Sequence, residues 1–301
     1  MNIDRLLFKF AFATDLHFEA SANPHVPEAN ARISCLLDDV NKQHPDFVLL
    51  GGDITQCGSA QIDELTMAKE TLDKLKPPYF LVAGNHDLAP HREIAVRYPG
   101  KEDYHDGQFE TSNFYQVFGD EGMRFSFQKG SIQFIGISLR DNDPDGALDW
   151  LEQEILQTNL SKIIMTHYGI YPPRNSGSPL EWWGFDRIAN SIPRLRSIIE
   201  RPNTGCIAYL YGHNHINSVI SQTDILHVSG GGIQKGCTGY WLLKCYRNSI
   251  KASFLSLSDV SLRDFNYHGV NAPGRCIDST HKTVKEYHKG NQKEQSLEIF
   301  F

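Results

Sequence analysis

Five short blocks of the chain combine histidine with aspartate or asparagine, side chains that commonly bind metal ions. In chain order they are Asp15-Leu16-His17, Gly52-Asp53, Gly84-Asn85-His86-Asp87, Thr166-His167 and Gly212-His213-Asn214-His215. Without His86 and Asp87, the donors are two carboxylates, one amide and four imidazoles, namely Asp15, Asp53, Asn85, His17, His167, His213 and His215. Such a set suits borderline ions such as manganese, iron or zinc. One ion would have too many ligands, whereas two ions that share a bridging carboxylate would use them all.

Each block follows a segment with the residue pattern of a β-strand. These strands are expected at residues 8–13, 46–50, 79–83, 162–166 and 206–211. Helical spacing of apolar residues predicts helices at 27–44, 59–75 and 145–158, and a helix broken near Pro193 within 185–200. Parallel strands that alternate with helices end at one edge of a sheet, where α/β proteins place their ligand sites. The five blocks are therefore expected to converge there.

The predicted fold class is α/β, a four-layer α/β/β/α sandwich of two mixed sheets flanked by helices. Further short strands are expected at 132–139, 219–220, 225–228, 240–246 and 250–255. The helix at 59–75 is expected to bury one apolar face, made of Ile62, Leu65, Ala68, Leu72 and Leu75. One domain is predicted over residues 1–257. Residues 258–301 lack strong periodicity and are interpreted as a C-terminal extension of unknown role.

Two segments, residues 88–124 and 170–185, read as long loops or insertions on the substrate side. Candidate substrate contacts in them are His91, Arg92, His105 and the pair Trp182-Trp183, with solvent exposure or loop packing as the ordinary alternatives. Arg140 and Arg174 are candidates for bidentate phosphate binding. His268, His281 and His288 have no metal-ligand spacing and are expected at the surface.

The composition limits which kinds of molecule are expected to bind the chain. The 301 residues carry 29 Lys and Arg against 36 Asp and Glu, a net charge of −7, so neither a nucleic-acid polymer nor an anionic membrane is expected as a partner. No apolar run approaches the ~18 residues of a membrane span, and the N-terminal residues do not resemble a signal peptide. A cytoplasmic location is expected. The six cysteines have no C-x-x-C spacing and are expected to be reduced thiols. The oligomeric state is not predicted.

Taken one at a time, the residues of the five blocks have ordinary explanations. Asp15, Asp53 and Asn85 suit turns after strands. His167 suits a hydrogen-bonded position in the core. All these explanations would have to hold together at five strand ends, so the joint pattern favours a metal site.

In these five blocks the chain resembles the calcineurin-like metallophosphoesterases. Their pattern is D-x-H, G-D, G-N-H-D or G-N-H-E, a lone H, and G-H-x-H, and all five blocks occur here in that order between residues 15 and 215. The resemblance implies that Asp15, His17, Asp53 and His215 bind one metal ion. It also implies that Asp53, Asn85, His167 and His213 bind a second ion, with Asp53 as the bridge.

The resemblance also implies a reaction. Two divalent or trivalent transition-metal ions would activate a bridging hydroxide, which attacks the phosphorus of a small phosphate ester in line. His86 would contact the scissile phosphate or protonate the leaving oxygen, and Asp87 would orient His86. A phosphodiester substrate is favoured slightly over a monoester.

The segment from Gly52 to Asp87 resembles the class III cyclic nucleotide phosphodiesterase branch, as do residues 113–115 and 125–127. Gln56 stands where purple acid phosphatases carry a tyrosine, which disfavours an iron–tyrosinate site. Many relatives read H-H-P where this chain reads His167-Tyr168-Gly169, so the wall of the site differs. Two other functions stay open: an interaction module without catalysis on the same fold, and a nuclease, against which the acidic charge argues.

Overall fold

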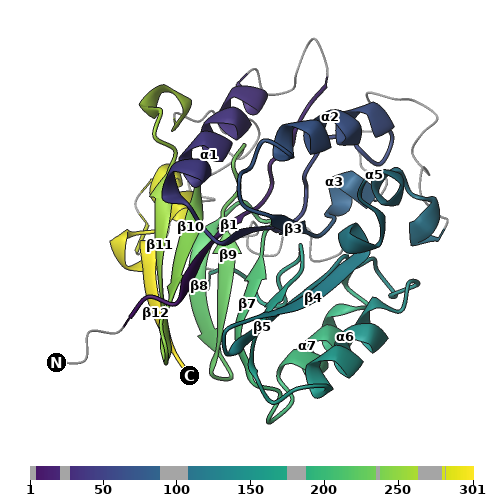
Figure 1. Cartoon of the computed structure of the whole chain (residues 1–301), viewed down its shortest axis with the longest axis vertical. Coiled ribbons are helices and arrows are strands. Elements are labelled where there is room, and N and C mark those ends of the chain that lie inside the picture. The colour runs from purple at the N-terminus through teal and green to yellow at the C-terminus, as the bar shows by residue number, and fades with distance from the viewer. Residues whose placement is uncertain are drawn as a thin grey trace.

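The computed structural model describes residues 5–20, 28–88, 108–174, 188–234, 238–263, 280–281 and 283–301. Twelve strands form two six-stranded sheets (Figure 1). The first sheet has the order β12-β11-β10-β1-β2-β3, with bounds Ser296–Phe300, Ser249–Ser256, Gly239–Cys245, Phe8–Ala13, Phe47–Leu50 and Tyr79–Leu81. The second has the order β4-β5-β6-β7-β9-β8, with bounds Arg124–Lys129, Ile132–Ile137, Ser161–Met165, Cys206–Tyr211, Ile225–Gly230 and Asn217–Gln222.

Both sheets are mixed. In the first, β1, β2 and β3 run parallel and the other pairs are antiparallel. In the second, β5, β6, β7 and β9 run parallel and the outer strands β4 and β8 are antiparallel. The parallel segments follow from the strand–helix–strand order of the sequence. The predicted α/β architecture of two mixed sheets flanked by helices is confirmed.

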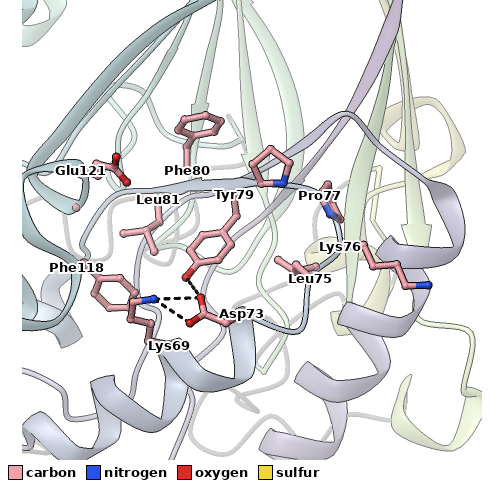
Figure 2. A pocket seen from close by; sticks show the side chains of 12 residues that line it. Lys69, Asp73, Leu75, Lys76, Pro77, Tyr79, Phe80, Leu81, Phe118 and Glu121 are labelled. Atoms are coloured by element: carbon pink, nitrogen blue, oxygen red, sulfur yellow. Dashed lines mark hydrogen bonds and ion pairs between the residues drawn. The ribbon is translucent and has the colours of Figure 1, made fainter.

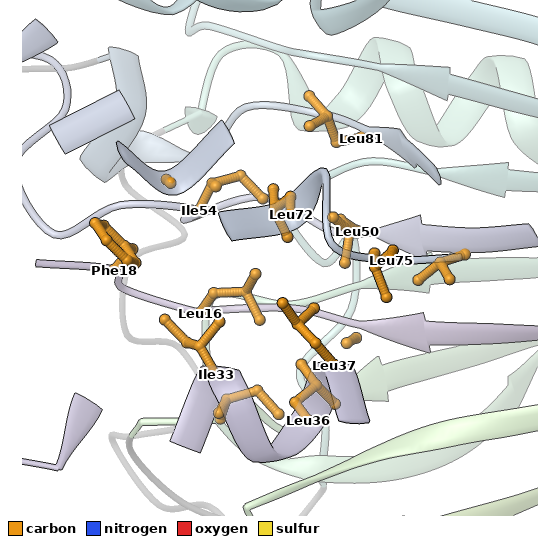
Figure 3. Packing of buried hydrophobic residues seen from close by; sticks show 14 of the residues in the cluster. Leu16, Phe18, Ile33, Leu36, Leu37, Leu50, Ile54, Leu72, Leu75 and Leu81 are labelled. Atoms are coloured by element: carbon orange, nitrogen blue, oxygen red, sulfur yellow. The ribbon is translucent and has the colours of Figure 1, made fainter. Parts of the chain in front are cut away.

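The core has three apolar layers. Between the sheets lies an aromatic cluster that includes Phe10, Phe47, Phe134 and Trp241. Helices α1 (Ala29–Gln43), α2 (Ile62–Leu72) and α5 (Asn113–Met123) cover the first sheet (Figure 1). Figure 3 shows leucines and isoleucines of α1 and α2 packed over the residues that follow β1 and β2. Helices α6 (Ala147–Leu156) and α7 (Ile192–Ile199) cover the second sheet.

Short helical elements complete the described chain. They are α3 (Asn85–Leu88), η1 (Phe109–Thr111), η4 (Val260–Arg263), α8 (Val284–Lys289) and η5 (Gln292–Gln295). Within the described ranges, no helix is both long and apolar enough to cross a lipid bilayer.

Three expectations about helices are wrong. Residues 113–123, expected as loop, form α5, and β4 follows directly after them. Gly119, with φ 65°, kinks the helix, so the apolar residues on its two sides do not share one helical period in the sequence. Ile62 is 36% exposed although its face is otherwise buried, because it begins α2 and has helix neighbours on only one side. Pro193 lies in the first turn of α7, where a proline is compatible with the helix, and does not break it.

The C-terminal residues join the main body. Strand β12 pairs antiparallel with β11 and forms an edge of the first sheet. A capping box of Thr283 and Glu286 starts α8. His281 and His288 are only 4% and 2% exposed, so the expectation that they lie at the surface is wrong. Several residues named above lie outside the described residues, namely His91, Arg92, His105, Trp182, Trp183 and His268, as do two of the six cysteines, Cys237 and Cys276.

Candidate metal centre

The register of the parallel strands places the five sequence blocks at one end of the two sheets. Ala13 of β1 pairs with Leu50 of β2, and Leu50 pairs with Leu81 of β3, so these strands end at the same level. The loops beyond them are joined by backbone hydrogen bonds, such as Asp15 N to Gly52 O at 3.0 Å. The loops after β6 and β7 meet in the same way, with Gly212 N donating to His167 O at 2.9 Å.

The structure brings the predicted donors into two groups. In each group, one donor atom per residue lies within 4.8 Å of all the others. The first group holds Asp15, His17, Asp53 and His215, and the second holds Asp53, His167 and His213. All of these residues are buried, at most 5% exposed. Because Asp53 belongs to both groups, one carboxylate can reach two cations.

Inside each donor group, imidazole nitrogens lie close to one another and to carboxylate oxygens. His17 Nε2 lies 3.2 Å from His215 Nε2, and His215 Nε2 lies 3.0 Å from Asp15 Oδ1. In the second group, His167 Nε2 lies 3.2 Å from His213 Nδ1 and 3.3 Å from Asp53 Oδ2. Imidazole nitrogens that converge on carboxylate oxygens are a suitable donor set for a transition-metal ion.

Asn85 supplies an independent test of whether a cation fits. Asn85 begins α3, and the next residue, His86, donates its backbone N–H to Asp53 Oδ1 at 2.9 Å. The Asn85 Oδ1 atom is buried, and no hydrogen-bond donor reaches it in the part of the chain that the structure describes. A buried oxygen without a donor is costly unless something binds it. A cation bound to Asp53, beside which His86 N–H is held, is the kind of partner that Asn85 Oδ1 lacks, so the residues present fit a metal centre.

The backbone of the centre is strained. Five of the candidate donors have left-handed φ angles, namely Asp15 (53°), His17 (47°), Asp53 (47°), His213 (70°) and His215 (53°). Each such conformation costs a non-glycine residue on the order of 1–3 kcal/mol and persists only where the surroundings hold it. This clustering of strain at the donors is typical of a site built for function rather than for stability.

Glycines let the loops approach each other. A Cβ atom on Gly212 would lie 2.0 Å from Thr14 Oγ1 and 2.4 Å from Asp15 Oδ2. Thr14 Oγ1 donates to Asp15 Oδ2 at 2.8 Å and so orients that carboxylate. The motif pattern had not singled out Thr14; its position beside Asp15 was the available signal.

The carboxylates and imidazoles of the centre shift one another's pKa values. Burial opposes ionisation of Asp53, but the surrounding imidazoles outweigh it and hold the Asp53 pKa well below its usual value. Burial would lower the pKa of His167, but the Asp53 carboxylate outweighs burial and raises it to about 9. Burial, together with the charge of His167, lowers the pKa of His213 to about 3. A cation that binds the second group therefore displaces a proton from His167.

His86 and Asp87 have separate roles in the hydrogen-bond network. His86 Nδ1 lies 2.7 Å from the carbonyl oxygen of Gln56, to which it can donate, and His86 Nε2 lies 4.0 Å from Asp53 Oδ2. Asp87 was expected to orient His86. Its carboxylate accepts instead from the backbone N–H groups of Ile54, Thr55 and Gly84 at 2.9–3.0 Å. Asp87 thus ties the turn that carries Asp53 to the turn that carries Asn85.

Both arginines proposed as phosphate ligands are engaged elsewhere. Arg140 Nε donates to Asp145 Oδ2 at 2.8 Å. Arg174 is 5% exposed and pairs with Glu294 in the C-terminal segment. Arg174 was a candidate for phosphate binding because sequence spacing carries no information about the position of Glu294.

A separate cavity of about 470 Å³ lies at the start of β3, between α2 and α5 (Figure 2). Two of its polar contacts involve Asp73: Lys69 Nζ lies 2.9 Å from Asp73 Oδ2, and Tyr79 donates to Asp73 Oδ1 at 2.7 Å (Figure 2). Lys76 and Glu121 also line the cavity. Tyr79 begins β3 whereas Asn85 follows its end, so this cavity lies away from the candidate centre.

Known structures share this architecture. A dimetal phosphatase from Danio rerio superposes with a TM-score of 0.59 at 11% identity, over 83% of this chain and 96% of that one. The purple acid phosphatase PPD1 from yellow lupin (Lupinus luteus) superposes with a TM-score of 0.56 at 13% identity, over 86% of this chain and 52% of that one. The fold is thus that of dimetal phosphatases, here with a candidate metal-binding cluster.

The sequence comparison is more specific. The model of the family described as Calcineurin-like phosphoesterase matches residues 8–217, so the chain belongs to that family of metal-dependent phosphoester hydrolases. A curated relative, the uncharacterized protein YvnB of Bacillus subtilis (strain 168), is 23% identical over 232 residues. That match covers 75% of this chain but only 16% of YvnB.

Proposed function

We propose that the chain is a dinuclear metal-dependent hydrolase of small phosphate esters, with phosphodiesters preferred. The observation that carries this proposal is the sharing of Asp53 between two buried donor groups. A shared carboxylate holds two cations at the separation that suits a phosphoryl group between them.

The proposed ligands are those that the motif pattern predicts. Asp15, His17, Asp53 and His215 would hold one manganese, iron or zinc ion, and Asp53, Asn85, His167 and His213 the other. When bound, such ions stabilise charge on phosphoryl oxygens and make water acidic enough to act as a nucleophile near neutral pH.

The remaining side chains orient the reaction. The Gln56 carbonyl accepts from His86 Nδ1, which leaves His86 Nε2 directed toward the centre. We assign to His86 Nε2 the hydrogen bond to the scissile phosphate or the proton for the leaving oxygen. Asp87 holds the two turns that carry Asp53 and Asn85, so it acts through the backbone.

The substrate preference rests on weaker support. Resemblance to the class III cyclic nucleotide phosphodiesterase branch favours a diester, and membership of that branch stays a prediction. The net charge of −7 supports a small ester over a nucleic-acid polymer as substrate. A membrane-independent, cytoplasmic location also stays a prediction.

A substrate panel with added Mn²⁺ tests the proposal. It contains an aryl phosphodiester, an aryl phosphomonoester, cyclic nucleotides, a dinucleotide polyphosphate and glycerophosphodiesters, with the His86→Ala variant as the control. We expect turnover of a diester by the wild type and strongly reduced turnover by His86→Ala, which still binds metal. Full activity of His86→Ala would refute the role of His86.

The two alternatives predict different outcomes. A protein that contains only trace metal after growth in Mn- and Zn-rich medium, and that hydrolyses nothing in the panel, would be an interaction module. Robust cleavage of polymeric DNA at low salt would favour a nuclease.

A further inference from the structure

The C-terminal segment, residues 283–301, lies against the backbone that carries one candidate ligand. His288 of α8 is 2% exposed, and its Nδ1 lies 2.9 Å from the carbonyl oxygen of His215. A carbonyl oxygen only accepts, so Nδ1 carries the proton and donates. The family model ends at residue 217, so this segment lies outside the matched residues.

A second set of contacts holds the same stretch two residues further on. Arg174 donates from Nη2 to the carbonyl oxygen of Asn217 at 2.8 Å and from Nε to that of Tyr287 at 2.9 Å. The side-chain amide of Asn217 donates to the carbonyl oxygens of Lys289 at 2.9 Å and Glu294 at 3.2 Å. The backbone from His215 to Asn217 is therefore bound to the C-terminal segment at both ends.

Other contacts fix the segment itself. Glu294 pairs with Arg174, and His281 Nε2 lies 2.7 Å from Glu294 Oε2. Strand β12 adds the segment to the first sheet through β11. Contacts before and after helix α8 in the chain therefore fix its position, and with it the position of the His288 side chain.

His215 needs such support. Its φ of 53° is left-handed, a conformation that a histidine adopts only when neighbouring groups hold it. A hydrogen bond to the carbonyl oxygen of His215 restricts rotation of the following peptide plane. Rotation of that plane would swing the imidazole away from His17 Nε2, which lies 3.2 Å from His215 Nε2.

We propose that His288 is a positioning residue of the metal centre, through which the C-terminal segment holds His215 in its ligating orientation. This inference rests on the proposed function, because it requires that the first donor group, which contains His215, binds a cation. It assigns a role to residues that sequence reasoning had set apart as an extension.

The test compares two replacements of His288 in metal-free protein titrated with Mn²⁺. Electron paramagnetic resonance counts unbound Mn²⁺ directly, so it requires no substrate. His288→Leu removes the donor, whereas His288→Asn places an amide N–H where Nδ1 stood. Each is measured in a His167→Ala background, which leaves the first donor group, and in a His215→Ala background, which leaves the second.

In the His167→Ala background, we expect His288→Leu to weaken Mn²⁺ binding by about 10–100-fold, the usual effect of losing a group that orients a ligand. We expect His288→Asn to restore it to within about threefold, and neither change to affect binding in the His215→Ala background. Equal losses in both backgrounds, unchanged binding by His288→Leu, or no rescue by His288→Asn would overturn the inference.

Two controls complete the design. His227→Leu removes another buried histidine, one that packs against Tyr171 and Tyr209, and is expected to leave Mn²⁺ binding unchanged. If His288→Leu does not fold, Asn217→Ala replaces it, since it removes the hydrogen bonds from the Asn217 amide to Lys289 and Glu294 while His288 stays. A loss confined to the first group then supports the inference, and unchanged binding overturns it. A wild type that binds none of Mn²⁺, Fe²⁺ and Zn²⁺ refutes the proposed function itself, whereas two bound Mn²⁺ ions with no effect of His288→Leu refute only this inference.

Discussion

Replacement of Gly84 by alanine perturbs the carboxylate that joins the two donor groups. A Cβ atom on Gly84 would lie 2.1 Å from Asp53 Oδ1 and 2.4 Å from Asp53 N. Ordinary van der Waals contact begins near 3.4 Å, so Asp53 must move by about 1.3 Å to accommodate the methyl group. The φ of Gly84 is not left-handed, so the backbone adds no strain of its own. The effect on Asp53 is therefore purely steric.

A misplacement of about 1 Å in a catalytic site costs roughly 100-fold in rate. That loss corresponds to about 2.7 kcal/mol of transition-state stabilisation. We therefore expect Gly84→Ala to lower kcat/KM for an aryl phosphodiester about 100-fold in the presence of Mn²⁺. The assay is paired with circular dichroism and thermal unfolding, to show that the variant is folded.

Gly119→Ala is the matched control. Gly119 has a left-handed φ of 65° and no atom within 4 Å of an added Cβ, so alanine strains the backbone without a clash. The ψ of Gly119 is −157°, a backbone region that is almost restricted to glycine, so we expect a loss of about 1–3 kcal/mol in unfolding free energy and turnover within twofold of the wild type. A folded Gly84→Ala enzyme that keeps more than about a third of the wild-type kcat/KM would refute the argument that Gly84 sets the position of Asp53.

Three further predictions concern metal binding and stability. Asp53→Asn is expected to weaken Mn²⁺ binding in both groups by more than about 100-fold, since changes around a ligand alone cost 10–100-fold; equilibrium dialysis that finds one site intact would contradict the shared carboxylate. Because His167 has a pKa of about 9 without a bound cation, binding of Mn²⁺ at pH 7 is expected to release about one proton, and its affinity is expected to increase as the pH rises toward 9. Calorimetry in two buffers of different ionisation enthalpy measures the number of protons released. Release of no proton at pH 7 would refute the prediction. Burial opposes ionisation of Glu294, but His281 and Arg174 outweigh it and lower the Glu294 pKa, so its stabilising effect is present above pH 4.5 and is lost as the pH falls through the lowered value. Glu294→Gln is expected to lose roughly 1–2 kcal/mol of unfolding free energy at pH 7 and progressively less below pH 4.5 in urea titrations; a loss independent of pH would contradict the ion pair.

The sequence by itself predicted every strand from β1 to β7 except β4, and it singled out the candidate donors. Strands such as β1 and β7 are made mostly of apolar residues, which show locally in the residue pattern. The donors directly follow these strands, and parallel strands must end at one edge of a sheet, so convergence followed without knowledge of any distance.

Local pattern failed where a neighbour far along the chain decides the outcome. Gly119 interrupts α5, which is stabilised by packing of Phe114 against the first core cluster. Arg174 looked like a phosphate ligand until its partner, 120 residues away, was in place. His288 has no motif around it, and contacts between residues far apart in the chain, such as the pairing of β12 with β11 and the hydrogen bonds of Arg174 and Asn217, place α8 beside His215.

The tertiary structure also decided the conformation of the donors. Residue types and spacing predict which side chains meet, because spacing is a property of the chain. The left-handed φ angles of His213 and His215 instead require contacts from several loops at once, since no histidine adopts that backbone unaided at low cost. Strain of this kind is held by the whole fold, and for that reason no local stretch of sequence reveals it.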